Sequence, residues 1–231
     1  MRKVIDEKDE KHRFLFECKY GTLKLVNSTL PEKVLEKTEN FYYIHNNVPA
    51  NYLKKLLRED RHGLLIFAPE DCTWTNALAL YKNINKVVKE MYFGTERKVK
   101  NPFEKCKNGR EIFHLSRHLL LEQKNLLSRI CVVMDREGNF RLKGQNTPQP
   151  SLTKLFCYNR YFDENQKQRP EFYKHDFLMP FSSVLGLNTA DSYEKLGVDI
   201  GGVLGGKKIY PLYGVWPPTQ VHVYKLFREM L

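Results

Sequence analysis

Basic side chains are concentrated in one stretch of the sequence, where nine lysines and arginines between Arg97 and Arg129 accompany only three glutamates. This local excess of six is more than half of the chain's net charge of +11. Lysine and arginine neutralise phosphates, and an aromatic ring among them can stack on a base, so the stretch suits RNA or another polyanion. The residues expected to make these contacts are Arg97, Lys98, Lys100, Phe103, Lys105, Lys107 and Arg110.

The first half of this stretch, residues 97–110, is predicted to be an exposed loop. It contains Pro102 and the Asn108-Gly109 pair and has neither a helical nor a strand period. A solvated surface loop without a ligand would have the same composition, so both interpretations stand on sequence alone.

Three residues with metal-binding side chains, Glu111, His114 and His118, recur at helical spacing just beyond the loop. Two imidazoles and a carboxylate on one helix face suit a transition metal. However, the histidines do not form an HExxH motif, and the neighbouring Arg110 and Arg117 would repel a cation. We therefore predict an ordinary helix face here and no metal site.

A glycine-rich segment, Gly201 to Lys208, partly matches a phosphate-binding P-loop. The GxxxxGK pattern is present, but Lys208 stands where a serine or threonine should bind Mg²⁺. The flanking residues also differ from the strand and helix that a P-loop needs, so a turn is expected. No GxGxxG motif and no nucleophile with a neighbouring base are recognised. The sequence thus predicts no catalytic residue, no cofactor and no bound metal.

Hydrophobic periodicity and helix caps predict the elements that position these residues. Helices are expected over Pro31–Thr38, Asn51–Arg58 with Asn51 as the cap, Thr73 to Gly94, and Gly109–Leu127. A buried strand is expected at Gly63–Ala68 and a hairpin at Arg129–Leu142, whereas His12–Val26 fits either a helix or two strands.

The rest of the chain is predicted to have less regular structure. Residues from about 143 to 174 are polar and interrupted by prolines, which favours an irregular insertion over the core. The last fifty residues are expected to form short strands and turns. Because no strand-helix-strand rhythm is sustained, we predict a single α+β domain over residues 1–231, with a mixed or antiparallel sheet and flanking helices.

Composition limits the class of protein. Of the 231 residues, 42% are hydrophobic and 13% aromatic, which is typical of a globular chain and argues against intrinsic disorder. No run approaches the roughly 18 apolar residues of a membrane span, and the charged first eleven residues predict no secretory signal. Five scattered cysteines suit free thiols in a reducing intracellular compartment, whether cytoplasm, nucleus or mitochondrion.

The C-terminal part has the most distinctive sequence in the chain. Its characteristic residues are Leu185-Gly186-Leu187, Gly197-Val198-Asp199-Ile200, Leu204-Gly205-Gly206, Ile209, Pro211, Tyr213-Gly214-Val215 and Pro218. This run, with Phe113 to Arg117 upstream, resembles the segment that precedes the catalytic domain in a family of class I S-adenosylmethionine-dependent methyltransferases. In that family the cofactor site follows this segment. The resemblance therefore implies a leading domain without its enzyme, a fragment, or a relative that has lost catalysis.

A second set of residues comprises Asn51–Phe67 and Tyr193–Gly197, followed by Leu204-Gly205 and Val215. These are similar to parts of the cobalamin-trafficking protein family of methylmalonic aciduria and homocystinuria type D. That resemblance implies a non-catalytic α+β adaptor that works by pairing with another protein.

Together these observations predict a non-catalytic basic binding module, a subunit of a larger assembly that contains RNA. The alternatives are an accessory or leading domain of a methyltransferase whose catalytic domain is on another chain, and an adaptor of the cobalamin-trafficking type. Tyr210, Tyr213 and Trp216 would dock on a partner protein, or else be buried in this chain's own core.

Overall fold

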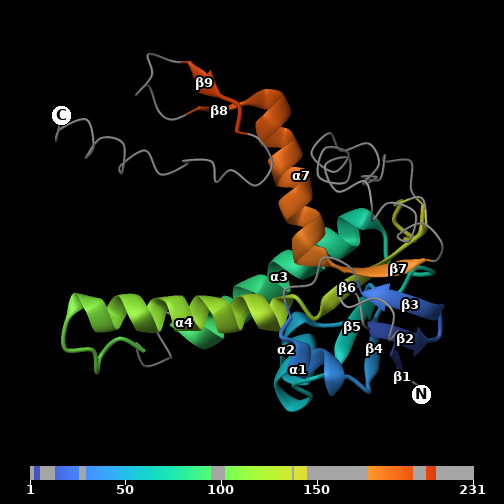
Figure 1. Ribbon diagram of the computed structural model, residues 1–231, viewed down its shortest axis with the longest axis horizontal. Coiled ribbons are helices and arrows are strands. Elements are labelled where there is room, and N and C mark those ends of the chain that lie inside the picture. Colours follow the sequence, from blue (N-terminus) through green and yellow to red (C-terminus); the bar gives the residue numbers. More distant parts are fainter. Residues whose placement is uncertain are drawn as a thin grey trace.

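A computed structural model describes residues 3–5, 14–25, 30–94, 102–136, 138–144, 176–199 and 207–211 (Figure 1). In chain order its elements are β1 (Lys3–Ile5), β2 (Phe14–Cys18), β3 (Gly21–Leu25), α1 (Glu32–Glu36), β4 (Phe41–Ile44), α2 (Ala50–Glu59), β5 (Leu64–Phe67), α3 (Trp74–Phe93), α4 (Gly109–Leu127), β6 (Ile130–Met134), β7 (Phe177–Pro180), α7 (Phe181–Leu196), β8 (Val198–Asp199) and β9 (Lys208–Ile209).

The described strands form a mixed sheet of seven strands in the order β1-β2-β3-β7-β6-β5-β4, and β8 pairs separately with β9. Strands β4, β5 and β6 are parallel, β7 runs antiparallel to β6, and β1 to β3 form an antiparallel meander. Strand β3 pairs with β7 in parallel and so connects the meander to the rest of the sheet. The predicted α+β class with a mixed sheet is confirmed.

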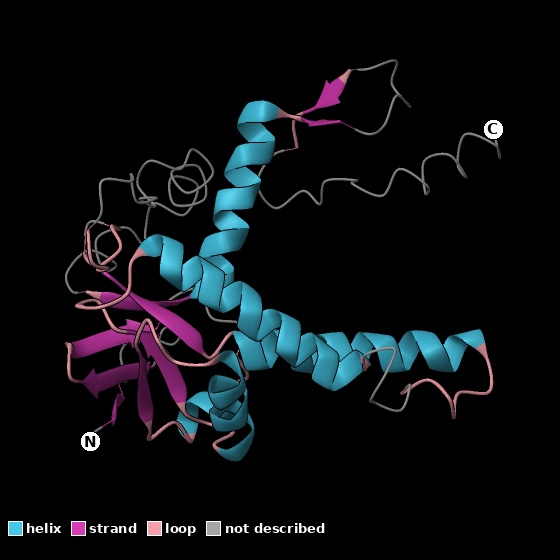
Figure 2. Cartoon of the chain, turned by 180° about the vertical axis from the view of Figure 1, so that it is seen from behind, coloured by secondary structure: helices cyan, strands magenta, loops and turns pink. Residues whose placement is uncertain are grey.

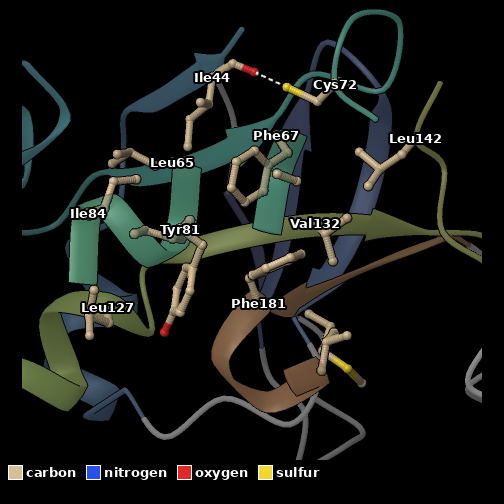
Figure 3. Packing of buried hydrophobic residues seen from close by; sticks show 14 of the residues in the cluster. Ile44, Leu65, Phe67, Cys72, Tyr81, Ile84, Leu127, Val132, Leu142 and Phe181 are labelled. Carbon is tan, nitrogen blue, oxygen red and sulfur yellow. Dashed lines mark hydrogen bonds between the residues drawn. The ribbon is translucent and has the colours of Figure 1, made fainter. Parts of the chain in front are cut away.

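The core lies on both faces of the sheet, since every residue of β5 and β6 is buried. Alternate side chains of a strand point to opposite faces. Leu65, Phe67 and Val132 therefore pack with α2, α3 and α7 on one face (Figure 3). Leu64 and Ile66 point to the other face and pack among Phe16, Leu23 and Leu35. Two buried faces explain why these strands read as continuous apolar runs.

Helices α3 and α4 run side by side away from the sheet (Figures 1 and 2). The side-chain amide of Gln123 on α4 donates to Asn85 on α3 at 2.9 Å. Thr73 caps α3 by accepting from the backbone of Asn76, and Gly94 ends the helix with a φ of 76°. Both predicted helices are confirmed, and so are their predicted ends.

Several predicted elements need correction. Helix α2 begins at Ala50 after Pro49, so Asn51 lies exposed in its first turn and is not the cap. The predicted hairpin at residues 129–142 is a turn with a single bridge, Met134 to Phe140, because β6 pairs instead with β5 and β7. The C-terminal part contains the long helix α7 and not only short strands.

One segment that fits either a helix or two strands on sequence alone is resolved by the structure. Within His12–Val26, residues 14–25 form the hairpin of β2 and β3, where Gly21 adopts a φ of 106°. Most of the predicted insertion, residues 145–174, lies outside the described residues.

Candidate polyanion-binding cleft

A cleft of about 850 Å³ opens where α2, α3 and α4 meet beside α1. Its cationic side chains come from α2 and the turn after it, with one from the residue before β6. They are Lys54, Lys55, Arg58, Arg61 and Arg129, with His62 beside them. Two carboxylates, Glu59 and Glu122, also line the cleft, so the wall carries an excess of three positive charges before any charge on His62.

Helix α2 presents its cations because its opposite side belongs to the core. Leu53 and Leu57 are almost completely buried, four residues apart on one side of the helix. Lys54 and Arg58 repeat at the same interval on the cleft side, and Arg58 is exposed. Lys55 lies 3.7 Å from Glu59, so one of the two carboxylates already has a cation next to it.

Arg129 forms the floor of the cleft and is only 2% exposed. Its guanidinium donates to the backbone carbonyls of Leu57 and Asp60 at the C-terminal end of α2. Carbonyls at a helix end lack partners within the helix and carry the negative end of its dipole, so they suit a buried cation. Burial lowers the pKa of Arg129 to about 10, which still leaves the group charged at neutral pH.

Asp60 shapes the turn that carries Arg61 and His62 to the rim. Its carboxylate accepts from the backbone N–H groups of His62 at 3.0 Å and Gly63 at 2.8 Å, and from the side chain of Asn40 at 2.8 Å. Burial opposes ionisation, but the donors prevail and lower the pKa of Asp60. A Cβ at Gly63 would lie 2.6 Å from the Asp60 carboxylate, so only glycine fits there.

Tyr92, at the end of α3, supplies an aromatic ring to the cleft wall. Burial and the nearby Glu122 raise the pKa of its phenol, against the opposing effect of Arg129, Arg61 and Arg58. Tyr92 and these three arginines line the same cleft. A neutral aromatic ring beside cations is an arrangement that can bind a base and its phosphates together.

None of the predicted polyanion contacts lines this cleft, and only some of them belong to the described residues. Arg97, Lys98 and Lys100 lie outside the described residues. Phe103 is half-buried, with its ring 6.5 Å from that of Phe93, which follows Tyr92 in α3.

The remaining predicted contacts, Lys105, Lys107 and Arg110, are exposed. Asn108 caps α4, so Arg110 lies in the first turn of the predicted helix and not in the loop.

Two of the three residues with metal-binding side chains on α4, Glu111 and His118, have partners close by on or beside the helix. Glu111 accepts from the backbone N–H of Lys107 at 2.8 Å, and so completes the cap of α4. His118 lies 3.4 Å from Glu122. Across the part of the chain that the structure describes, no three potential ligands gather as a metal would require.

The C-terminal candidates are described only in part. Tyr210 is 58% exposed. Its ring packs over Gly197, where a Cβ would lie 2.9 Å from it. Tyr213, Trp216 and residues 201–206 of the glycine-rich segment lie outside the described residues, and the Lys208 amine donates to the Leu196 carbonyl at 3.0 Å.

Sequence reasoning missed the cations of α2 because the first sixty residues are close to neutral as a whole. The signal was nevertheless present in the spacing. Lys54 and Arg58 are four residues apart within a predicted helix, so they had to share one face. Arg129 gave no such signal, since nothing in the sequence distinguishes a buried arginine from an exposed one.

Comparisons with protein-family models, with curated proteins and with solved structures return no match. The two resemblances therefore stay predictions. Among the described residues, no helix combines the length and the apolar composition needed to cross a bilayer.

Proposed function

We propose that this chain is a non-catalytic module that binds RNA through the cleft between α2, α3 and α4, within a larger assembly. The observation that carries the proposal is the charge of the cleft wall. Five lysines and arginines line it with two carboxylates, and three of the five, Lys55, Arg58 and Arg61, are exposed at the rim. Such a wall attracts phosphates and releases their counterions.

A polymer suits this surface better than a small anion because the cations are spread out. Lys54 and Arg58 are about 6 Å apart along the axis of α2, and Arg61 lies just beyond the end of the helix. A second hollow of about 540 Å³ shares Glu59, Arg61 and His62 with the cleft, but Asp60 also lines it, so the row of cations ends at Arg61. Successive phosphates of one strand could therefore contact successive side chains.

A ring at the wall favours single-stranded nucleic acid. Tyr92 offers a surface on which an unpaired base can stack, and stacking tolerates any base. RNA is preferred over DNA here only as the more common single-stranded partner, since an unstructured strand of either kind offers the same chemistry.

The test is a filter-binding measurement with an unstructured 20-nucleotide RNA at about 0.1 M salt. Arg58→Gln/Arg61→Gln removes two exposed cations from the cleft, and the expected result is at least tenfold weaker binding. Lys82→Gln/Lys86→Gln is the matched control. It makes the same change of charge at exposed positions of α3 outside the cleft, and is expected to weaken binding less than threefold. Equal losses in both variants, or no binding by the unmodified chain, would contradict the proposal.

A further inference from the structure

Helix α4 carries an exposed stripe that combines apolar and basic residues. Phe113 is 60% exposed and Leu120 49%, and these two residues are seven positions apart. Arg110, Arg117 and Lys124 are also exposed and repeat at the same interval, with Arg110 three positions before Phe113 and Arg117 three before Leu120. Leu121, 56% exposed, borders them. Because a helix turns about 100° per residue, these residues all fall on one face of α4, here called the α4 stripe.

Within the described part of the chain, the α4 stripe takes no part in the packing of the fold. Helix α4 faces the core and α3 with other residues, namely Gln123, Leu126 and the buried Leu127. Its carboxylates are engaged elsewhere, Glu111 in the helix cap and Glu122 beside His118. Among the described residues, no carboxylate lies within ion-pair distance of Arg110, Arg117 or Lys124. Large exposed apolar side chains on one helix face indicate a binding surface.

We propose that the α4 stripe binds an acidic amphipathic helix of a partner protein. Phe113 and Leu120 would contact leucines of that helix, as apolar residues do at the seam of a coiled coil. The cations lie within the seam, so a partner must bring carboxylates to the facing positions. From Arg110 to Lys124 the stripe is about 21 Å long, which is enough for about four helical turns.

A second copy of this chain fits the stripe poorly. If two α4 helices paired in antiparallel fashion about the middle of the stripe, Arg117 would face Arg117, and Arg110 would face Lys124. If they paired in parallel, each cation would face its own equivalent. Like charges that face one another in a seam disfavour pairing of two α4 helices. The stripe therefore favours an acidic partner over a second copy of this chain.

An anionic lipid surface also fits poorly. Helices that lie in a membrane interface have a continuous apolar sector with cations at its margins. Here Arg117 lies between Phe113 and Leu120 along the stripe, so inserting the apolar side chains would bring a guanidinium into the hydrocarbon region.

The test uses a labelled synthetic peptide of three heptads with leucine at each d position and glutamate at each a position. A second peptide has lysine in place of each glutamate. Fluorescence anisotropy should give micromolar binding of the acidic peptide and at least tenfold weaker binding of the basic one. Arg117→Glu should weaken binding of the acidic peptide at least tenfold and strengthen binding of the basic peptide. Lys86→Glu, an equal charge change on α3, should alter each affinity less than threefold.

Reversal of the preference by Arg117→Glu cannot arise from a misfolded variant, which would lose both peptides. The proposal is overturned if both peptides bind equally, if neither binds, or if the acidic peptide binds equally well to Arg117→Glu. It is also overturned if Arg117→Glu abolishes RNA binding or binding to vesicles with 30% phosphatidylserine while leaving the acidic peptide bound. The cleft variant Arg58→Gln/Arg61→Gln should bind the acidic peptide normally, so this result is independent of the proposed RNA site.

Discussion

The guanidinium of Arg129 donates a hydrogen bond to the backbone carbonyl of Leu57, 72 residues earlier in the chain. A second hydrogen bond, to the carbonyl of Asp60, fixes the same side chain to the end of α2. One buried cation therefore joins the start of β6 to the helix that carries the cations of the cleft. Removing it affects the folded structure as well as the charge of the cleft.

Arg129→Met keeps an unbranched side chain but removes all the donors. The two carbonyls at the end of α2 would then be buried without their partner, and we expect a loss of about 2–4 kcal/mol in the free energy of unfolding. Urea denaturation measures this loss. Arg117→Met, at an exposed position on α4, is the control and should change stability by less than about 0.5 kcal/mol. Equal stability of the two variants would show that Arg129 does not hold α2.

Phe181 holds the start of α7 against the core. Its ring centroid lies 5.1 Å from that of Phe67 and 5.2 Å from those of Trp74 and Tyr81. Phe181→Ala should cost about 3–5 kcal/mol, because the cavity would be surrounded by three rings. Phe113→Ala removes the same side chain at a 60% exposed position and should cost less than about 0.5 kcal/mol. A small loss at Phe181 in thermal or urea unfolding would mean that α7 is not anchored as described.

Glu70 makes stability depend on acid pH. The hydrogen bond from Lys19, aided by one from Tyr20 and opposed by burial, lowers the pKa of Glu70 from 4.5 to about 2. The unfolded chain therefore binds a proton more readily, and the stabilisation is complete above pH 4.5 and disappears as pH falls from 4.5 to 2. The effect is small because both side chains are partly exposed.

Urea denaturation at pH 6, 4 and 3 tests this dependence. The stability difference between the unmodified chain and Glu70→Gln should shrink as pH falls through this range, more than it does for Glu36→Gln on the surface of α1. A difference that stays constant with pH would contradict the role of the Lys19 contact.

Tyr92 should contribute to RNA binding through its ring and not its hydroxyl. Tyr92→Phe should bind the 20-nucleotide RNA within about twofold of the unmodified chain, whereas Tyr92→Leu should bind about tenfold more weakly, because loss of one stacked base costs about 1–3 kcal/mol. Both affinities come from filter binding at one salt concentration. Equal affinities of the two variants would argue that no base stacks there.

Local signals were sufficient to predict much of the fold. An apolar run without alternation predicted β5, because a strand buried on both faces has no polar side. Thr73 and Gly94 bounded α3, because a capping hydroxyl and a glycine of positive φ act within a few residues.

Elements determined by distant contacts were not predictable in the same way. Strand β7 pairs with β6 and β3, far away in sequence, and no local pattern encodes such a choice. Helix α7 contains Gly186 and Thr189, which lower helix propensity, and it is held in place by the burial of Phe181, Val184 and Leu187. The cleft depends on the packing of three helices, so its charges could be located only in part, from the spacing in α2.

The salt dependence of RNA binding tests the central claim most directly. If about four cations of the cleft contact phosphates, the logarithm of the association constant for a single strand should fall with the logarithm of the salt concentration with a slope of about −3. Removing two contacts in Arg58→Gln/Arg61→Gln should reduce the slope to about −1.4, while Lys82→Gln/Lys86→Gln should keep the original slope. A slope near zero for the unmodified chain, or the same slope for the chain and for its cleft variant, would contradict phosphate binding in the cleft.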